Sequence, residues 1–293
     1  MQNAFLFILF SSLLGCSNDE KHDCCNTYKD VVTLVQNDKP VIIGILGNSI
    51  GNGQFAKTNN GHPFDTKSML IQTQGPTYNM LTNFGPHLPV EGWANQFYAY
   101  LLIKNRKSVV INYSGSAWDT ADQLGANPGT FGFAMQNNVA LFINMKPKPH
   151  AILLPLQVND FSHGLSVKKF TENYSQIINQ LIAAGIVPIV VLENPIYNNK
   201  QLAGKNGAPL DVNQSALTNH IIAAKTMADA RGLGVIDFFT PIDNLAKQQV
   251  GADYGTQLYK TGLFSDSNIV MHPIQAGHNL MANISIDFFK QNF

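Results

Sequence analysis

The residues of this chain that are best placed to do chemistry are Ser49 and His272. Ser49 follows the apolar run 41–46, which breaks at Gly47 into a polar turn. A serine at the carboxyl end of a buried strand faces the ligand crevice of an open α/β sheet. It becomes a nucleophile only where a base removes its proton, and a histidine from another loop is the usual base. We therefore interpret Ser49 as a candidate nucleophile and His272 as its base.

The elements that would position these residues alternate along the chain. Short apolar runs alternate with longer amphipathic runs, which is typical of a parallel sheet covered by helices on both faces. The expected strands are 41–47, 108–112, 150–156, 186–192 and 233–237. The expected helices lie near 91–104, 134–146, 168–184, 213–231 and 274–290. The sequence thus predicts one α/β domain of three layers, with a five-stranded parallel sheet in the middle.

Composition narrows the classes of function. The chain has 293 residues, of which 45% are hydrophobic and 13% are charged, and this suits a single large core. Its 19 basic residues balance its 19 acidic residues, so we expect no nucleic-acid partner.

The turn around Ser49 lacks the lysine and the spacing of a phosphate-binding loop, and the scattered histidines lack the paired spacing of a metal site. We therefore expect neither a metal nor a cofactor.

The beginning of the chain carries a targeting signal in our interpretation. Residues 4–14 are apolar but too few to span a bilayer, and the run ends in Leu-Gly-Cys at Cys16. This resembles a bacterial lipoprotein signal and implies a signal over 1–16, a tether over 17–38 and a domain over 39–293. The protein would then lie on the bacterial cell envelope, facing the periplasm or on the outer membrane, held only by a lipid at Cys16. Because no positive charge precedes the run, a non-lipidated secretory signal and a cytosolic N-terminal helix remain alternatives.

Four blocks of the sequence carry a resemblance to a known family. The blocks are Ser49, 112–117, 157–160 and 272–273, and the stretch from His272 to Met281 reads His-Pro-x-x-x-Gly-His-x-x-Met. This order resembles that of the SGNH hydrolases, also called GDSL esterases, over roughly residues 41–293. The resemblance implies a flavodoxin-like three-layer fold and a serine ester hydrolase.

The resemblance also implies a role for individual residues. Ser49 matches the family nucleophile, and His272 matches the general base. The oxyanion formed during acyl transfer would be bound by the Ser49 N–H, by the Asn159 side chain and by one more backbone N–H. Aligned without a gap, Ala117 falls at the family's glycine, while Gly115 lies two residues earlier. We favour Gly115 as that third donor and keep Ala117 as the alternative.

This chain departs from the family pattern at three positions. Asn48 replaces the aspartate of Gly-Asp-Ser, and Gln157 replaces the glycine of Gly-x-Asn-Asp. The third departure is Ile269, which occupies the place of the carboxylate that orients the base, three residues before His272. Asp266 could serve instead if residues 267–269 bulge outward, and otherwise a Ser-His dyad would operate.

The sequence predicts the substrate less precisely than the type of reaction. The insertion 51–90, together with 89–94, resembles the family branch that deacetylates carbohydrates, so an acetylesterase acting on acetylated carbohydrate or another small ester is expected. Trp118 either walls the acyl pocket or is an ordinary core or surface aromatic. A lipase or thioesterase of the same fold is an alternative, as is a non-catalytic glycan-binding surface lipoprotein. The sequence does not predict an oligomeric state.

Overall fold

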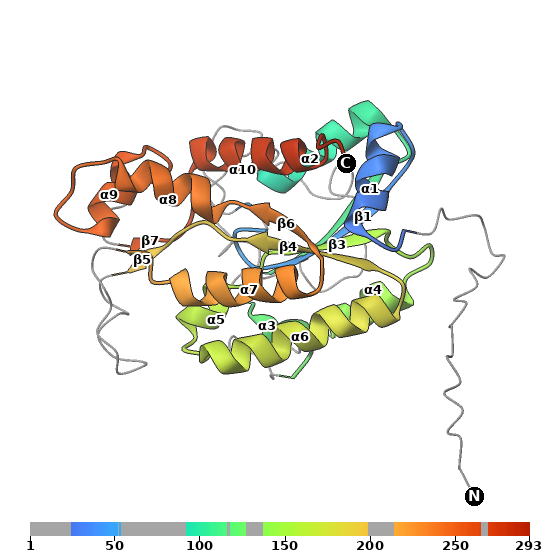
Figure 1. Ribbon diagram of the computed structural model, residues 1–293, viewed down its shortest axis with the longest axis horizontal. Coiled ribbons are helices and arrows are strands. Elements are labelled where there is room, and N and C mark those ends of the chain that lie inside the picture. The colour runs from blue at the N-terminus through green and yellow to red at the C-terminus, as the bar shows by residue number, and fades with distance from the viewer. Residues whose placement is uncertain are drawn as a thin grey trace, which may run out of the picture.

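The structure is a computed structural model with a single parallel sheet at its centre (Figure 1). It describes residues 25–51, 53, 92–115, 118–126, 137–198, 214–264 and 269–293. The five strands run in the order β2-β1-β3-β4-β6, and every neighbouring pair is parallel. This is the flavodoxin-like order, in which the first strand lies inside the sheet. The predicted three-layer α/β fold is confirmed.

Each strand of this sheet coincides with an apolar run of the sequence. The strands are β1 (Ile42–Gly47), β2 (Val109–Ser114), β3 (Ala151–Leu154), β4 (Val187–Leu192) and β6 (Gly234–Asp237). All residues of β3 and β4 are buried, as expected for central strands covered on both faces. The strands were therefore predictable from continuous hydrophobicity.

Helices cover both faces of the sheet (Figure 1). One face carries α1 (Tyr28–Gln36), α2 (Trp93–Lys104) and α10 (Gln275–Phe288). The other carries α3 (Thr120–Gln123), α4 (Asn138–Asn144), α5 (Val158–Ser162), α6 (Val167–Ala183) and α7 (Thr218–Ala230). The expected helices correspond to α2, α4, α6, α7 and α10, whereas the short α3 and α5 were not expected.

The tether expected over residues 17–38 is wrong in its second half. Helix α1 lies there and begins with a capping box formed by Thr27 and Asp30. It buries Val31, Val32 and Val35 in the core, and each such side chain contributes roughly 1.5–3 kcal/mol. These three valines lie on one face of a helix among polar neighbours, which explains why the segment looked like a linker. Residues 28–36 are therefore part of the packed domain and not of a tether.

A small substructure lies beside one end of the sheet. It consists of α8 (Phe239–Lys247), α9 (Tyr254–Lys260) and a two-stranded antiparallel sheet of β5 (Tyr197–Asn198) and β7 (Ile269–Val270). None of these elements was expected. Their importance is positional, because β7 ends immediately before Met271 and His272.

Parts of the sequence prediction fall outside the described residues. They include the signal and Cys16, nearly all of the insertion 51–90, Ala117, Asp266 and most of the expected loop 194–212. Within the described part of the chain, no helix combines the length and the apolar character that crossing a bilayer requires.

Candidate active site

The candidate catalytic residues come from chain segments that meet at one edge of the sheet. Ser49 lies two residues beyond the end of β1, and Asn159 lies in α5, which follows β3. The carboxyl ends of parallel strands share an edge, so these two segments are neighbours. His272 is supplied by the connection between β7 and α10.

Ser49 and His272 are in hydrogen-bond contact. The distance between Ser49 Oγ and His272 Nε2 is 2.8 Å, although 223 residues separate the two in the sequence. Ser49 is buried, with only 3% of its surface exposed. A hydroxyl held against an imidazole nitrogen at this distance is the arrangement that serine nucleophiles use.

The surroundings of His272 favour its neutral form. Burial, with a smaller contribution from the nearby His278, lowers the pKa of His272 to about 4. Desolvation disfavours a cation, and a second imidazole adds repulsion. At neutral pH the His272 ring is therefore uncharged and able to accept a proton.

The turn that carries Ser49 is held from several sides. Asn48 Oδ1 accepts a hydrogen bond from the Ile50 N–H at 2.9 Å, which closes the turn locally. The indole N–H of Trp93 donates to the Ile50 carbonyl at 3.0 Å, and Gln123 Nε2 donates to the Gly47 carbonyl at 2.8 Å. Trp93 is fully buried, and its side chain supports the nucleophile turn from within the core.

Asn159 has its side chain fixed by one hydrogen bond. Its Nδ2 donates to the Trp118 carbonyl at 2.9 Å, and the residue is only 5% exposed. A side-chain amide carries two N–H donors, and this bond uses one of them. Asn159 is thus a rotationally fixed donor in α5, as an oxyanion-binding residue must be.

Gly115 has a different role from the one expected. Its N–H donates to the Gly47 carbonyl at 3.3 Å and so extends the pairing of β1 with β2. A Cβ at this position would lie 2.2 Å from the Trp118 ring, so the position requires glycine for packing. Because its N–H is already bonded, Gly115 is not the free donor that we favoured, and Ala117, outside the described residues, remains the candidate.

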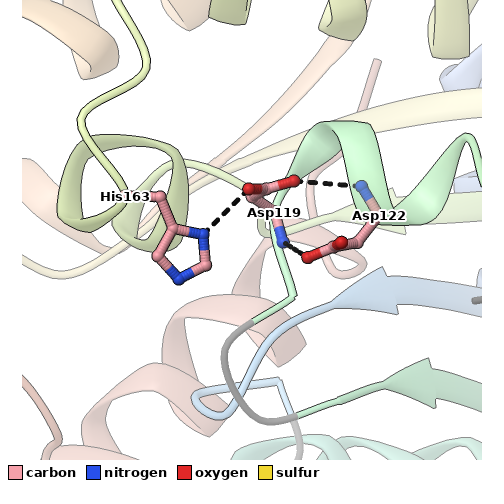
Figure 2. Close-up of side chains that lie close together, drawn as sticks. All are labelled: Asp119, Asp122 and His163. Atoms are coloured by element: carbon pink, nitrogen blue, oxygen red, sulfur yellow. Dashed lines mark hydrogen bonds and ion pairs between the residues drawn. The ribbon is translucent and has the colours of Figure 1, made fainter. Parts of the chain in front are cut away.

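Two contacts tie α5 to the segment after β2. Asp160 accepts hydrogen bonds from the Thr120 N–H at 3.1 Å and from the Thr120 hydroxyl. His163 Nδ1 lies 2.8 Å from Asp119 Oδ2, and Figure 2 shows its ring directed at this carboxylate. Burial raises the pKa of Asp160 well above its usual range, and the charges of Asp119 and Glu193 raise it further.

Asp119, Asp122 and His163 form the one group of possible metal ligands among the described residues. Their candidate ligand atoms lie within 4.8 Å of one another. However, Asp119 Oδ1 accepts from the N–H groups of Ala121 and Asp122, and Asp122 Oδ2 accepts from the Asp119 N–H. These bonds form the capping box of α3, so helix capping explains the cluster, and we assign no metal to it.

Comparisons with known proteins identify the fold. No protein-family model and no curated protein matches the sequence. Among solved structures, a protein provisionally assigned as a GDSL-like lipase from Parabacteroides merdae aligns with 86% of this chain and 96% of its own, at 15% identity and a TM-score of 0.54. This is the fold of the SGNH hydrolases.

Two further structures with the SGNH hydrolase fold are named for carbohydrate esters. A variant of an acetyl-xylooligosaccharide esterase from Geobacillus Stearmophilus aligns at 12% identity and a TM-score of 0.52, over 86% of this chain and 95% of its own. A two-domain esterase active on acetylated mannans aligns at 14% identity and a TM-score of 0.53, over 92% of this chain and 54% of its own. At such identities the likeness establishes the fold alone.

Two departures from the SGNH pattern meet at one buried residue. Glu193 follows β4 and is fully buried. It accepts a hydrogen bond from Asn48 Nδ2 at 2.7 Å and another from the Gln157 N–H at 2.5 Å. Sequence reasoning missed Glu193, although a glutamate directly after a fully apolar strand could have indicated a residue at the ligand edge.

The third departure lies in a short strand. Ile269, at the place of the family's orienting carboxylate, belongs to β7, and its backbone pairs with Asn198. The segment just before His272 is therefore occupied by a strand. Asp266 lies outside the described residues, so its role stays a prediction.

Proposed function

We propose that this protein is a serine ester hydrolase that forms a covalent acyl-enzyme and removes acetyl groups from carbohydrate. The observation that carries the proposal is the 2.8 Å contact between Ser49 Oγ and a neutral His272 Nε2. The SGNH hydrolase fold supports it, because neighbours with this fold include proteins named as esterases.

The proposed reaction has two half-reactions, and both use the same base. The His272 Nε2 atom accepts the Ser49 proton as Oγ attacks the ester carbonyl carbon. The tetrahedral intermediate collapses, the carbon–oxygen bond to the alcohol breaks, and the alcohol leaves with the proton from His272. Water then attacks the acyl-serine and gives a proton to His272. The bond between the acyl carbon and Ser49 Oγ breaks, Oγ regains its proton from His272, and the acid leaves.

The oxyanion of each intermediate needs donors that are already in place. We assign this role to the Ser49 N–H, to the second N–H of the Asn159 amide and to the Ala117 N–H. The bond from Asn159 to the Trp118 carbonyl supports this assignment, because it fixes the amide before substrate arrives. Fixed donors of this kind contribute about 3–4 kcal/mol each to the transition state.

The acetylated-carbohydrate substrate is the finer part of the proposal. It is supported by the resemblance of the insertion 51–90 to carbohydrate deacetylases and by two neighbours of the same fold that are named for acetylated glycans. Because one fold hosts many substrates, the acyl preference must be measured.

The first experiment compares the acetate, butyrate and octanoate esters of p-nitrophenol as substrates of residues 26–293. This segment retains Thr27 and Asp30, and hence the capping box of α1. We expect acetate-selective turnover that Ser49→Ala abolishes, together with rapid labelling of Ser49 by a fluorophosphonate. Octanoate-selective turnover would favour a lipase or thioesterase. Failure of Ser49 to label would overturn the esterase proposal in favour of a binding protein.

A further inference from the structure

Glu193 is a buried carboxylate to which the proposed reaction gives no task. Its Oε1 accepts from Asn48 Nδ2 at 2.7 Å, and its Oε2 accepts from the N–H groups of Gln157 and Val158 at 2.5 and 2.7 Å. Asn48 immediately precedes Ser49. The two N–H groups belong to the turn that begins α5, where Asn159 lies. One side chain therefore joins the nucleophile turn to the candidate oxyanion donor.

The partners of Glu193 are themselves fixed. Asn48 Oδ1 accepts from the Ile50 N–H at 2.9 Å, so the same amide bonds to Glu193 and closes the turn around Ser49. Gln157 Oε1 accepts from the Glu193 N–H at 2.9 Å, which returns a bond in the opposite direction. The connected groups form a rigid bridge between the ends of three strands.

The contacts also indicate the charge of Glu193. Burial raises its pKa, while the hydrogen bonds from Val158, Gln157 and Asn48 oppose that rise. Among the described residues, the three groups that are hydrogen-bonded to the carboxylate oxygens are all donors. A protonated carboxyl would direct its own O–H at one of them, so the geometry fits the ionised form.

We propose that Glu193 is a positioning residue for ester hydrolysis, which sets the placement of Ser49 relative to Asn159 by fastening both segments to the end of β4. The inference rests on the proposed function and deepens it. It accounts for Asn48 and Gln157 together, because both of these departures from the family pattern are hydrogen-bonded to Glu193.

The donor and the acceptor of the bond between Asn48 and Glu193 can be exchanged by mutation. When Asn48→Asp and Glu193→Gln are combined, the new amide can donate to the new carboxylate where the old amide donated. The other oxygen of residue 48 still accepts from the Ile50 N–H, and the amide oxygen of residue 193 still accepts from Gln157 and Val158. Either change alone breaks the bridge. Asn48→Asp places a second carboxylate against Glu193, and Glu193→Gln places an amide N–H donor against the Asn48 amide N–H donor.

The test compares the wild-type chain with both single variants and the double variant. The readouts are kcat and KM for p-nitrophenyl acetate and the rate of fluorophosphonate labelling. Each single variant should lose about 10²-fold in kcat and in labelling rate, with KM nearly unchanged, because misplacement of about 1 Å has that effect. The double variant should return to within about tenfold of wild type. A double variant no better than the product of the two singles would overturn the proposal.

Two additions keep the test decisive. If a single variant does not fold, Asn48→Ala removes the bond to Glu193 together with the bond from the Ile50 N–H and should still lower kcat, and wild-type kcat in this variant would overturn the inference. The matched control is Asp243→Asn, a buried carboxylate in α8 bonded to Tyr254, which should lower stability without lowering kcat. Wild-type protein lacking Ser49-dependent turnover would overturn the proposed function itself. An active wild type without rescue in the double variant would overturn only the bridge.

Discussion

At the scale of single residues, His272 is proposed to act as a neutral base, and this gives the activity a definite pH dependence. Burial lowers the pKa of His272 to about 4, below the ordinary histidine value of about 6.5. The protonated ring cannot accept the Ser49 proton, so activity is lost as pH falls through the lowered pKa. We expect kcat/KM for p-nitrophenyl acetate to be flat from about pH 8 to about pH 5.5 and to fall tenfold per unit below about pH 4.

The measurement needs a control for acid unfolding. Tryptophan fluorescence, recorded in the same buffers, reports whether the fold persists, and Ser49→Ala gives the uncatalysed background. A fall in activity centred near pH 6.5 in folded protein would contradict the prediction, because it would show a histidine with its ordinary pKa.

Asp266 is expected to orient His272 although it does not occupy the family's position. A carboxylate that holds the imidazole tautomer and stabilises the imidazolium changes turnover far more than binding. We therefore expect Asp266→Asn to lower kcat by about 10²–10⁴-fold with little change in KM. The control is Asp237→Asn. The Asp237 side chain accepts a hydrogen bond from the Thr240 N–H, and its substitution should leave kcat unchanged. An unaltered kcat for Asp266→Asn would indicate a Ser-His dyad.

Asn159 provides a test of the oxyanion site. Removing one preorganised donor costs about 10²–10³-fold in kcat, so Asn159→Ala should fall in that range while KM changes little. The matched control is Asn173→Ala, another buried asparagine, whose Nδ2 donates to the Thr120 hydroxyl at 3.0 Å. It should affect stability more than turnover. Equal losses of kcat in the two variants would contradict a specific role for Asn159.

The residues of this site were predictable from the sequence to unequal degrees. Ser49, Asn159 and His272 lie in short blocks whose residue types and order are visible in one dimension. Glu193 was missed, and the supporting contact of Trp93 was not foreseen. Each acts on the nucleophile turn through a contact with a distant segment, which residue spacing does not reveal. The role of Gly115 was misjudged because its N–H is taken by a sheet bond that pattern reading does not reveal.

At the scale of elements, hydrophobic runs predicted the strands and long helices but not the short helices. Helix α5 spans only five residues, and its role is to present Asn159 and Asp160 at the end of a connection from β3. One and a half turns carry no readable periodicity. Helix α1 was missed for another reason. Only three of its residues, Val31, Val32 and Val35, are buried, and the polar residues between them gave the segment the composition of a linker.

The start of helix α10 positions His272 by close packing. Gly277 lies over the loop that carries His272, and a Cβ at Gly277 would lie 2.5 Å from Pro273 Cβ and 3.0 Å from the Leu263 carbonyl oxygen. Since the helix cannot approach this loop as closely with a larger residue at position 277, Gly277→Ala should displace Pro273 and, with it, His272. We expect kcat to fall about 10–10²-fold, with KM nearly constant.

The control for this helix is Ala276→Gly, at an exposed position of the same turn. It costs about 1 kcal/mol of helix propensity but creates no clash, so kcat should be retained. Urea unfolding of both variants separates lost stability from lost positioning. If Gly277→Ala kept wild-type kcat, the packing at this point would not determine the placement of His272.

At the scale of the whole molecule, the sheet order explains why residues so far apart in sequence converge. Strands β1, β3 and β4 are adjacent and parallel, so the segments that follow them all begin at the same edge of the sheet. Ser49, Asn159 and Glu193 follow these strands in turn, and α10 with β7 returns His272 to the same edge. The topology was predictable because the flavodoxin-like order follows from the family resemblance. The small sheet of β5 and β7 was not, because each of its strands has only two residues.

We also propose that the intact protein is held to a bacterial membrane by lipid on Cys16. A lipid chain contributes about 0.8 kcal/mol per buried CH₂ group, and two or more chains give stable anchoring. Because the chain has no net charge, electrostatic attachment to anionic lipid would contribute little, so a salt wash should not release the protein. In cells producing the full chain, we expect the protein in the membrane fraction after high salt and carrying a metabolically incorporated fatty-acid label.

Cys16→Ser should release the protein from that fraction and abolish the label while leaving kcat unchanged, since Cys16 has no role in the proposed reaction. Cys24→Ser is the matched control, because it alters a cysteine in the same segment and should remain membrane-bound. Retention of the Cys16→Ser protein in the membrane would contradict the lipid anchor, and a soluble wild-type protein would favour the non-lipidated signal. Retention of the Cys16→Ser protein in the membrane would leave the catalytic proposal intact, because that proposal rests on the contact between Ser49 and His272.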